Sequence, residues 1–223
     1  LVTSLLLLEK KKSTITSSLS SNTTEQIAVI GMACHFPEAN SLALYWDNLA
    51  NGRDCIKEVP SSRWDVEQYY REGEYKNGYS SSKWGAFLEK IEDFDPHYFG
   101  ISEELASQMD PLARQWLEVS AEALADAGFD RKSLWGQQVG VFVGTRSGNF
   151  SQKFGINDMI KDIIVGVGQN FIGAHVSHFY NFKGPNMIID AACASALTAI
   201  HQAVKSLQSG ESKVALAGGV DII

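Results

Sequence analysis

Apolar and polar residues follow two patterns along this chain: short apolar runs, and longer segments with apolar residues at helical spacing. The runs predict strands over residues 27–31, 139–144, 186–190 and 213–218. Helices are predicted after Ser41, after Asp110, within 163–180 and over 194–208. Strands that alternate with helices favour an α/β sheet with helices on its faces.

Capping residues mark several boundaries of these helices. Ser41 is expected to cap the first helix and Gly52 to end it. Asp110, followed by a proline, starts the second helix, which Gly128 ends, and Gly210 stops the last one. The apolar faces expected to be buried are Leu42, Trp46 and Leu49; Leu112, Trp116, Val119 and Ala123; and Leu197, Ile200, Val204 and Leu207.

Residues 53–100 show neither pattern and read as a long irregular region rich in aromatic side chains. This region contains ten aromatic rings. We expect them to pack against the rest of the protein, because rings of this number would not remain exposed on a solvated linker. They are Trp64, Tyr69, Tyr70, Tyr75, Tyr79, Trp84, Phe87, Phe94, Tyr98 and Phe99.

The first 26 residues differ from the rest. Four leucines at 5–8 precede three lysines and a Ser/Thr-rich stretch. Four apolar residues are too few for the core of a signal peptide, and in a signal peptide the basic residues come before the apolar run, not after it. We interpret residues 1–26 as a flexible linker or the tail of an upstream helix, with docking by the leucines as an alternative, and residues 27–223 as the folded domain. Because the chain starts with Leu1 and stops directly after an apolar segment, we expect it to be a piece of a longer protein.

Composition excludes several classes of protein. A chain of 223 residues with 44% hydrophobic content is not disordered, and a net charge of −7 disfavours nucleic acid as a partner. No apolar run approaches the roughly 20 residues that span a membrane. The three cysteines form no CxxC pair, so a disulfide framework or structural zinc is not expected and a reducing, cytoplasmic setting fits.

Cys193 is the candidate nucleophile. It lies between the predicted strand 186–190 and a helix of small residues, so its thiol is expected in a strand-to-helix turn. Unpaired N–H groups and the helix dipole favour a thiolate there and would stabilise an oxyanion. The alternative from position alone is a buried cysteine that packs as a small hydrophobic residue.

The segment 190–197 (DAACASAL) resembles the nucleophile motif of β-ketoacyl synthases, especially those of modular polyketide synthases. Other segments resemble the same family in the same order, and the resemblance runs from about residue 27 to the end. They are 27–37 (IAVIGMACHFP), 94–102 (FDPHYFGIS), 109–111 (MDP), 117–118 (LE), 122–124 (EAL), 126–128 (DAG), 141–144 (VFVG) and 217–220 (AGGV). Family members often carry Thr and Ser where this chain has Ala191 and Ala194, so the subfamily stays open.

The resemblance implies a thiolase-like fold of layered α-β-α-β-α architecture, of which this chain holds roughly the first half. It also implies an acyltransferase of polyketide or fatty-acid-like biosynthesis. Cys193 takes an acyl chain from the phosphopantetheine thioester of an acyl carrier protein, and its backbone N–H helps to form the oxyanion hole. A malonyl-type extender then loses carbon dioxide, and its carbanion attacks the acyl thioester. The family's two histidines and lysine for this step come from motifs absent here, so we expect the 223 residues alone to be inactive in the condensation.

The resemblance also implies partners and a pocket. Ile163, Ile164, Val165 and Phe171 are expected to line an acyl passage, with ordinary core packing as the equal alternative. The strand 186–190 resembles one that pairs across the two-fold axis of homodimers, and its uncharged centre predicts burial on both faces. No cofactor is expected to bind directly, because phosphopantetheine arrives on the carrier protein. Other domains of a larger synthase are further expected partners.

No metal site is predicted. His175 and His178 are three residues apart in a predicted helix, but no third ligand has sensible spacing, so packing is the better interpretation. Two alternatives to a condensing enzyme stay open. One is a non-elongating ketosynthase-like domain that binds or transfers acyl chains, and the other is a scaffold whose cysteine is incidental.

Overall fold

The computed structural model describes residues 3–10, 26–73, 75–155 and 157–222, and its centre is a five-stranded mixed sheet with strand order β2-β1-β7-β5-β6. The strands are β1 (Thr3–Lys10), β2 (Ile27–His35), β5 (Val139–Gly144), β6 (Asn186–Ile189) and β7 (Val214–Val220). β7, β5 and β6 run parallel, whereas β1 is antiparallel to both of its neighbours. The predicted α/β class is therefore confirmed.

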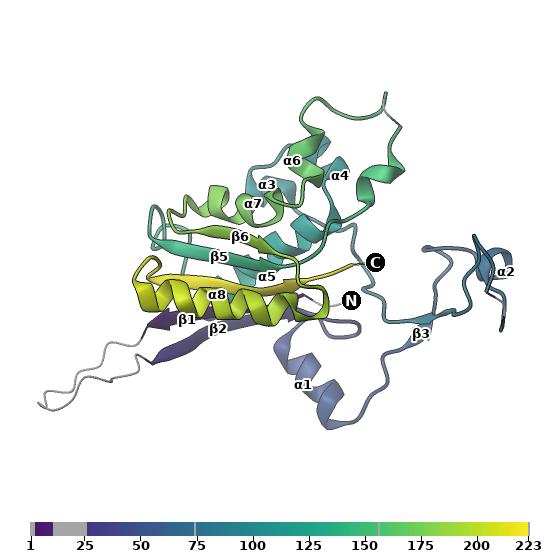
Figure 1. Cartoon of the computed structure of the whole chain (residues 1–223), viewed down its shortest axis with the longest axis horizontal. Coiled ribbons are helices and arrows are strands. Elements are labelled where there is room, and N and C mark those ends of the chain that lie inside the picture. Colours follow the sequence, from purple (N-terminus) through teal and green to yellow (C-terminus); the bar gives the residue numbers. More distant parts are fainter. Residues whose placement is uncertain (1–2, 11–25, 74, 156, 223) are drawn as a thin grey trace, which may run out of the picture.

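Helices cover both faces of this sheet (Figure 1). α5 (Pro111–Asp126) and α7 (Phe171–Tyr180) pack on one face, where Trp116 and Val143 lie in a shared core. α8 (Ser195–Ser209) packs on the other, against Phe142 and Ala217. The remaining helices are α1 (Leu42–Ala50), α2 (Val66–Tyr69), α3 (Pro96–Phe99), α4 (Glu103–Gln108) and α6 (Ile163–Val167), with 3₁₀ turns η1 (Phe150–Lys153) and η2 (Ala192–Ala194).

The prediction that residues 1–26 are a linker or a helix tail is wrong for residues 3–10. These residues form β1, which lies between β2 and β7 and hydrogen-bonds to both. Leu5 and Leu7 enter the core under α5, whereas Leu6 and Leu8 face the core under α8. A strand buried on both faces needs a continuous apolar run rather than an alternating one, which explains the four leucines. Residues 11–25 of the expected linker lie outside the described part of the chain.

Two predicted helices have the expected boundaries, but α1 exposes its predicted face, and α8 exposes Leu197 while Ile200, Val204 and Leu207 reach the core as predicted. α1 begins after Ser41, whose Oγ accepts a hydrogen bond from the Leu44 N–H at 3.3 Å, yet Trp46 is 71% exposed. In α8, Leu197 is 73% exposed, and the fully buried stripe consists of Ala199, Ala203 and Leu207. Small residues bury best there because α8 lies close against the sheet.

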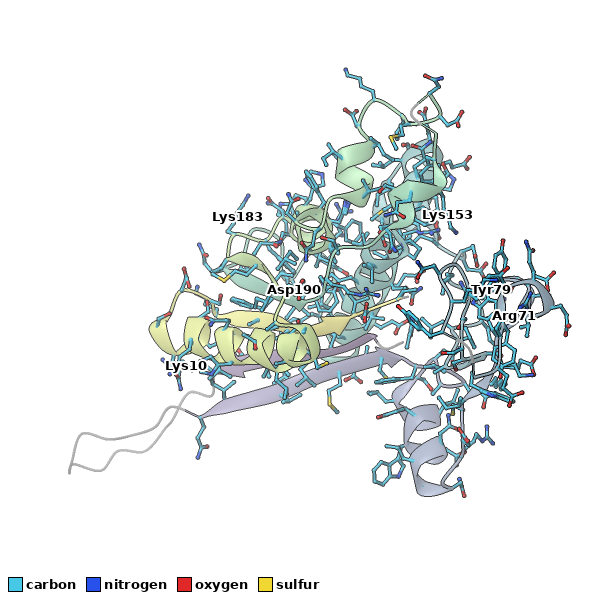
Figure 2. The ribbon with its side chains drawn as sticks, turned by 45° about the vertical axis from the view of Figure 1, so that its right-hand side comes forward. Lys10, Arg71, Tyr79, Lys153, Lys183 and Asp190 are labelled. Carbon is cyan, nitrogen blue, oxygen red and sulfur yellow. The ribbon has the colours of Figure 1, made fainter. Side chains whose placement is uncertain are left out.

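Most of the aromatic region forms an arm beside the sheet that carries the short hairpin β3 (Lys57–Glu58) and β4 (Trp84–Gly85) (Figure 2). Its last part differs, because Phe94 and Phe99 pack in the core under α5 and α7. The expectation that all ten rings are packed is wrong for Tyr69, Tyr75, Tyr79 and Trp84, which are exposed. Tyr98 is also exposed, but the centre of its ring lies 4.8 Å from that of Phe99, so it packs as expected. Some of these rings meet cations instead. The Arg71 guanidinium lies 4.7 Å from the centre of the Tyr79 ring, and the Lys83 ammonium 5.6 Å from that of Trp84.

None of the helices within the described residues has the length and apolar content needed to cross a membrane.

Candidate active site around Cys193

Cys193 lies in the turn that joins β6 to α8, as predicted, and it is exposed. The chain leaves the sheet after Ile189, passes through Asp190 and Ala191, and enters the 3₁₀ turn η2, which contains Cys193. In Figure 2, Lys183 and Asp190 mark the two ends of the segment that includes β6. The alternative in which Cys193 packs as a buried hydrophobic residue is therefore wrong.

Hydrogen bonds hold the turn in a strained conformation. Ala192, directly before the thiol, has φ 51°, in the left-handed region that costs an alanine about 1–2 kcal/mol. The Ser195 Oγ accepts from the Ala191 N–H at 2.8 Å and donates to the Ala192 carbonyl at 2.7 Å. Asp190 Oδ1 accepts from the Ala192 N–H at 3.1 Å. These contacts fix how the next residue, Cys193, is presented.

Two glycines let α8 begin directly on the sheet. A Cβ atom at Gly144, the last residue of β5, would lie 2.4 Å from the Ser195 carbonyl carbon. At Gly219 of β7 it would lie 2.8 Å from the Ala196 Cβ. No side chain within the described part of the chain caps α8 at Ala194. Cys193 lies two residues before the first residue of α8, at the end of the helix whose dipole favours negative charge.

Three charged residues follow the carboxyl ends of the parallel strands, and two of them are in contact. Arg146 follows β5, and its Nε donates to the Asp221 Oδ1, just after β7, at 2.8 Å. This contact raises the pKa of the Arg146 guanidinium, and the charge of Asp190 after β6 acts in the same direction. The sequence analysis did not single out Arg146 or Asp221. Their position directly after parallel strands is the signal that would have found them, because side chains at strand ends meet at one edge.

The four predicted pocket residues lie on α6 and at the start of α7. Ile163, Ile164 and Val165 belong to α6, and Ile164 is 61% exposed, whereas Phe171 begins α7. Between them, Gln169 Nε2 donates to the Thr145 carbonyl at 3.2 Å, which ties this segment to the end of β5. The segment therefore reaches the edge of the sheet that carries Cys193, and its role as an acyl passage stays a prediction.

Two hollows in the surface lie away from Cys193. One of about 310 Å³ is lined by residues of the aromatic arm, among them Trp64 and Trp84, and by Ile222. A second of about 270 Å³ is lined by Cys55, Lys57 and their neighbours. Cys193 lines neither of them.

Three of the histidines have partners or places other than the thiol. The His175 Nε2 lies 2.9 Å from the Val165 carbonyl, and burial lowers the pKa of this ring. His97 meets Glu103 at 3.2 Å, and His201 lies eight residues beyond Cys193 in α8, about 12 Å along the axis. Among the described residues, no group of three or more His, Cys, Asp or Glu side chains is placed to hold a metal ion.

A second titratable cluster joins β2 to α5. His35 Nε2 lies 2.9 Å from Glu122 Oε1, and His35 Nδ1 lies 3.0 Å from Gln115 Oε1. Gln115 Nε2 donates to Glu118 Oε2 at 3.1 Å, so the Gln115 oxygen is left to accept from His35. Both ring nitrogens then donate, which requires the protonated imidazolium, and the hydrogen bond to Glu122 raises the pKa of His35.

Replacing Glu118 with glutamine is expected to stabilise the protein at pH 8. Burial raises the pKa of Glu118 from its ordinary 4.5 to about 7, so the folded chain binds this proton more tightly than the unfolded one. The free energy of unfolding then falls as the pH rises between those two values. Because Glu118 is only half-buried, we expect E118Q to gain about 1–2 kcal/mol at pH 8 and almost nothing at pH 4.5.

Urea unfolding at the two pH values measures this difference. The matched control is E104Q, which neutralises an exposed glutamate on α4 and should shift neither value. An equal change at both pH values in E118Q would contradict the assignment.

Comparison with known proteins identifies what this chain is similar to. The sequence profile of the family described as "Beta-ketoacyl synthase, N-terminal domain" matches residues 24–223. Polyketide synthase PksL of Bacillus subtilis (strain 168) is 39% identical over 208 residues, which cover 89% of this chain and 5% of PksL. The 6-methylsalicylic acid synthase of Penicillium patulum is 40% identical over 206 residues, 90% of this chain and 11% of that protein.

Solved structures give the same result. The oxazolomycin ketosynthase domain OzmH KS7 of Streptomyces albus JA3453 superposes with a TM-score of 0.79 at 36% identity, over 87% of this chain and 34% of that one. The ketosynthase from module 6 of the bacillaene synthase of Bacillus subtilis 168 has a TM-score of 0.72 at 29% identity, over 100% of this chain and 32% of that one. The chain thus spans about a third of the solved domains and confirms the expected thiolase-like architecture of their N-terminal part.

Proposed function

This chain belongs to the β-ketoacyl synthase family, and from that premise we propose that Cys193 is the nucleophile that accepts an acyl chain during polyketide synthesis. The observation that carries the proposal is the exposed thiol at the start of α8, on a strained turn that hydrogen bonds hold in place. A thiol presented in this way meets a substrate carbonyl without first having to be uncovered.

The loading step is a thioester exchange. The Cys193 thiolate attacks the carbonyl carbon of an acyl thioester on the phosphopantetheine arm of an acyl carrier protein. The backbone N–H of Cys193 and the first N–H groups of α8 stabilise the oxyanion. When the carbon–sulfur bond to pantetheine breaks, the arm leaves as a thiol, and the acyl group remains on Cys193. The energies of the two thioesters are nearly equal, so loading is reversible.

The second step is decarboxylative Claisen condensation. A malonyl-type extender on a carrier protein loses carbon dioxide, and the resulting carbanion attacks the acyl–Cys193 carbonyl. A carbon–carbon bond forms, the β-ketoacyl product stays on the carrier, and the Cys193 thiol is released. Within the described part of the chain, His35, His97 and His175 contact Glu122, Glu103 and the Val165 carbonyl, respectively, rather than Cys193. We therefore propose that the 223 residues by themselves load acyl groups without condensing them.

Two further assignments belong to this proposal. Ile163, Ile164, Val165 and Phe171 line the passage for the acyl chain, which the contact of Gln169 with the end of β5 supports. A homodimer forms through the region 186–190. β6 is an edge strand of the sheet and Met187 is 42% exposed, so the chain alone does not bury this strand on both faces as predicted. A strand from a second copy would pair with that edge.

Selective labelling tests the nucleophile. We expect a short pulse of iodoacetamide, followed by peptide mass mapping, to modify Cys193 before Cys34 or Cys55. Cys34 is buried, and burial raises the pKa of its thiol, while Cys55 is half-buried beside Asn48. Prior incubation with an acyl-pantetheine thioester should add the acyl mass to Cys193 and protect it from the pulse. Equal labelling of the three cysteines, or an acyl group found on another residue, would overturn the proposal.

A further inference from the structure

A cluster of polar side chains joins the end of β2 to one face of α5. His35 is the last residue of β2, and its Nε2 lies 2.9 Å from Glu122 Oε1 while its Nδ1 lies 3.0 Å from Gln115 Oε1. Gln115 is buried, and its Nε2 donates to Glu118 Oε2 at 3.1 Å. Gln115, Glu118 and Glu122 are three and four residues apart, so α5 presents all three on one face.

The cluster fastens a strand that lies at the edge of the sheet. Among the described strands, β2 pairs with β1 alone, so its packing on α5 is its main other attachment. Gly31 approaches α5 so closely that a Cβ atom there would lie 2.4 Å from the Ala123 carbonyl oxygen. The Met32 N–H donates to Asp126 Oδ2 at 2.9 Å. The contacts of His35 add a further attachment at the last residue of the strand.

The direction of these hydrogen bonds depends on a proton on His35. An ionised Glu118 can only accept, so it takes the N–H of the Gln115 amide and leaves the amide oxygen facing His35. An ionised Glu122 can also only accept. Both ring nitrogens must then donate, which only the imidazolium can do. When the ring loses a proton, one nitrogen becomes an acceptor that faces another acceptor, and a charge-assisted hydrogen bond is lost.

We propose that His35, Gln115, Glu118 and Glu122 form a pH-sensitive clasp between β2 and α5, which holds while His35 is protonated and weakens when the ring loses its proton. The hydrogen bond to Glu122 raises the pKa of His35 above its ordinary 6.5, against the desolvation of the ring. The folded chain therefore binds this proton more tightly than the unfolded chain. The stability that the clasp contributes is complete below pH 6.5 and is lost as the pH rises through the raised pKa.

The two glutamates of the clasp are the charges in its contact network with the ring. The strand on the other side of β2 places the neutral Thr3 opposite His35. The remaining charged or titratable groups on the surrounding elements have other environments. They are Arg114, which donates to the Glu92 carbonyl; Asp126, which accepts from the Met32 N–H; Asp93, whose charge acts on Glu118; Cys34, which is buried; and Glu38, which pairs with Lys57.

The test is urea unfolding of the 223-residue chain at about pH 6 and about pH 9. Glutamine carries no charge, so H35Q should raise the unfolding equilibrium constant about tenfold at the lower pH and less than about twofold at the higher. Arginine stays charged and has donors for both Gln115 and Glu122. H35R should therefore match the unaltered chain at the lower pH and be about tenfold more stable at the higher. Glu118 is present in all three chains, so comparing them at one pH removes most of its own contribution.

H97Q is the matched control. His97 also meets a glutamate, Glu103, at 3.2 Å, but both of these side chains are exposed, so the variant should change stability at neither pH. A pH-dependent loss in H97Q as large as that in H35Q would overturn the proposal. A loss in H35Q of equal size at both pH values would also overturn it, because packing alone would explain such a loss.

Nitrogen NMR of the unaltered chain gives a second measurement that needs no stable H35Q variant. The signals of the His35 ring, assigned by their absence in H35R, should titrate with a midpoint above 6.5. A midpoint at or below 6.5 would contradict the clasp, as would an H35R chain that is no more stable than the unaltered one at the higher pH. None of these measurements involves Cys193, so the inference stands or falls independently of the proposed function.

Discussion

Replacing Cys193 with alanine is expected to abolish covalent acylation by an acyl-pantetheine thioester. The acyl group needs a sulfur at the start of α8, and alanine offers no atom that can form a thioester. Intact-protein mass spectrometry should show one acyl mass on the unaltered chain and none on C193A. Because Cys193 is exposed, the free energy of unfolding should change by less than about 0.5 kcal/mol.

The matched controls are the two other cysteines. C34A and C55A remove thiols that lie outside the turn of the nucleophile, so both variants should keep the acyl adduct. C34A should lose some stability because Cys34 is buried. An acyl adduct that persists in C193A would refute the assignment of Cys193 as the nucleophile. Loss of the adduct in C55A would indicate that Cys55 is the acylated residue instead.

Replacing Leu7 with aspartate is expected to unfold the sheet. Leu7 is 0% exposed and lies in the core under α5, on a strand that hydrogen-bonds to both neighbours. A carboxylate there would be buried without a partner, which costs more than about 4 kcal/mol, a large share of the stability of a typical domain. Urea unfolding followed by circular dichroism measures the loss, and the milder L7A should lose about 2–5 kcal/mol.

This prediction separates two interpretations of the N-terminal residues. Glu9 is exposed on the same strand, so E9A should leave the unfolding midpoint almost unchanged. If the first residues were a linker, L7D would behave like E9A. Equal midpoints for the two variants would therefore contradict the central place of β1 in the sheet.

Local signals in the sequence predicted much of the scaffold. Asp110 caps α5 through the Leu112 N–H at 2.9 Å, and Gly128 and Gly210 adopt the positive φ that ends a helix. The place of Cys193 between β6 and α8 followed in the same way from an apolar run and small residues. Such signals act over a few residues, so they can be read without knowing what lies across the sheet.

Contacts between residues far apart in the sequence could not be predicted from such local signals. A run of four leucines fits the tail of a helix as well as it fits a buried strand. Only the pairing of β1 with β2 and β7 distinguishes the two structures. Leu197 has the spacing of a buried residue, yet α8 turns Ala199 and Ala203 to the sheet instead. Which apolar stripe is buried depends on how closely a helix approaches its neighbours.

The sequence by itself determined the family and most of the central strands and helices, and it singled out Cys193 as the candidate nucleophile, because caps, periodicity and motifs are properties of neighbouring residues. Only the tertiary structure decided that β1 lies inside the sheet, and that Arg146 and Asp221 pair beyond the carboxyl ends of β5 and β7. These residues are up to 75 positions apart, and strand order and register bring them together, which no local pattern encodes.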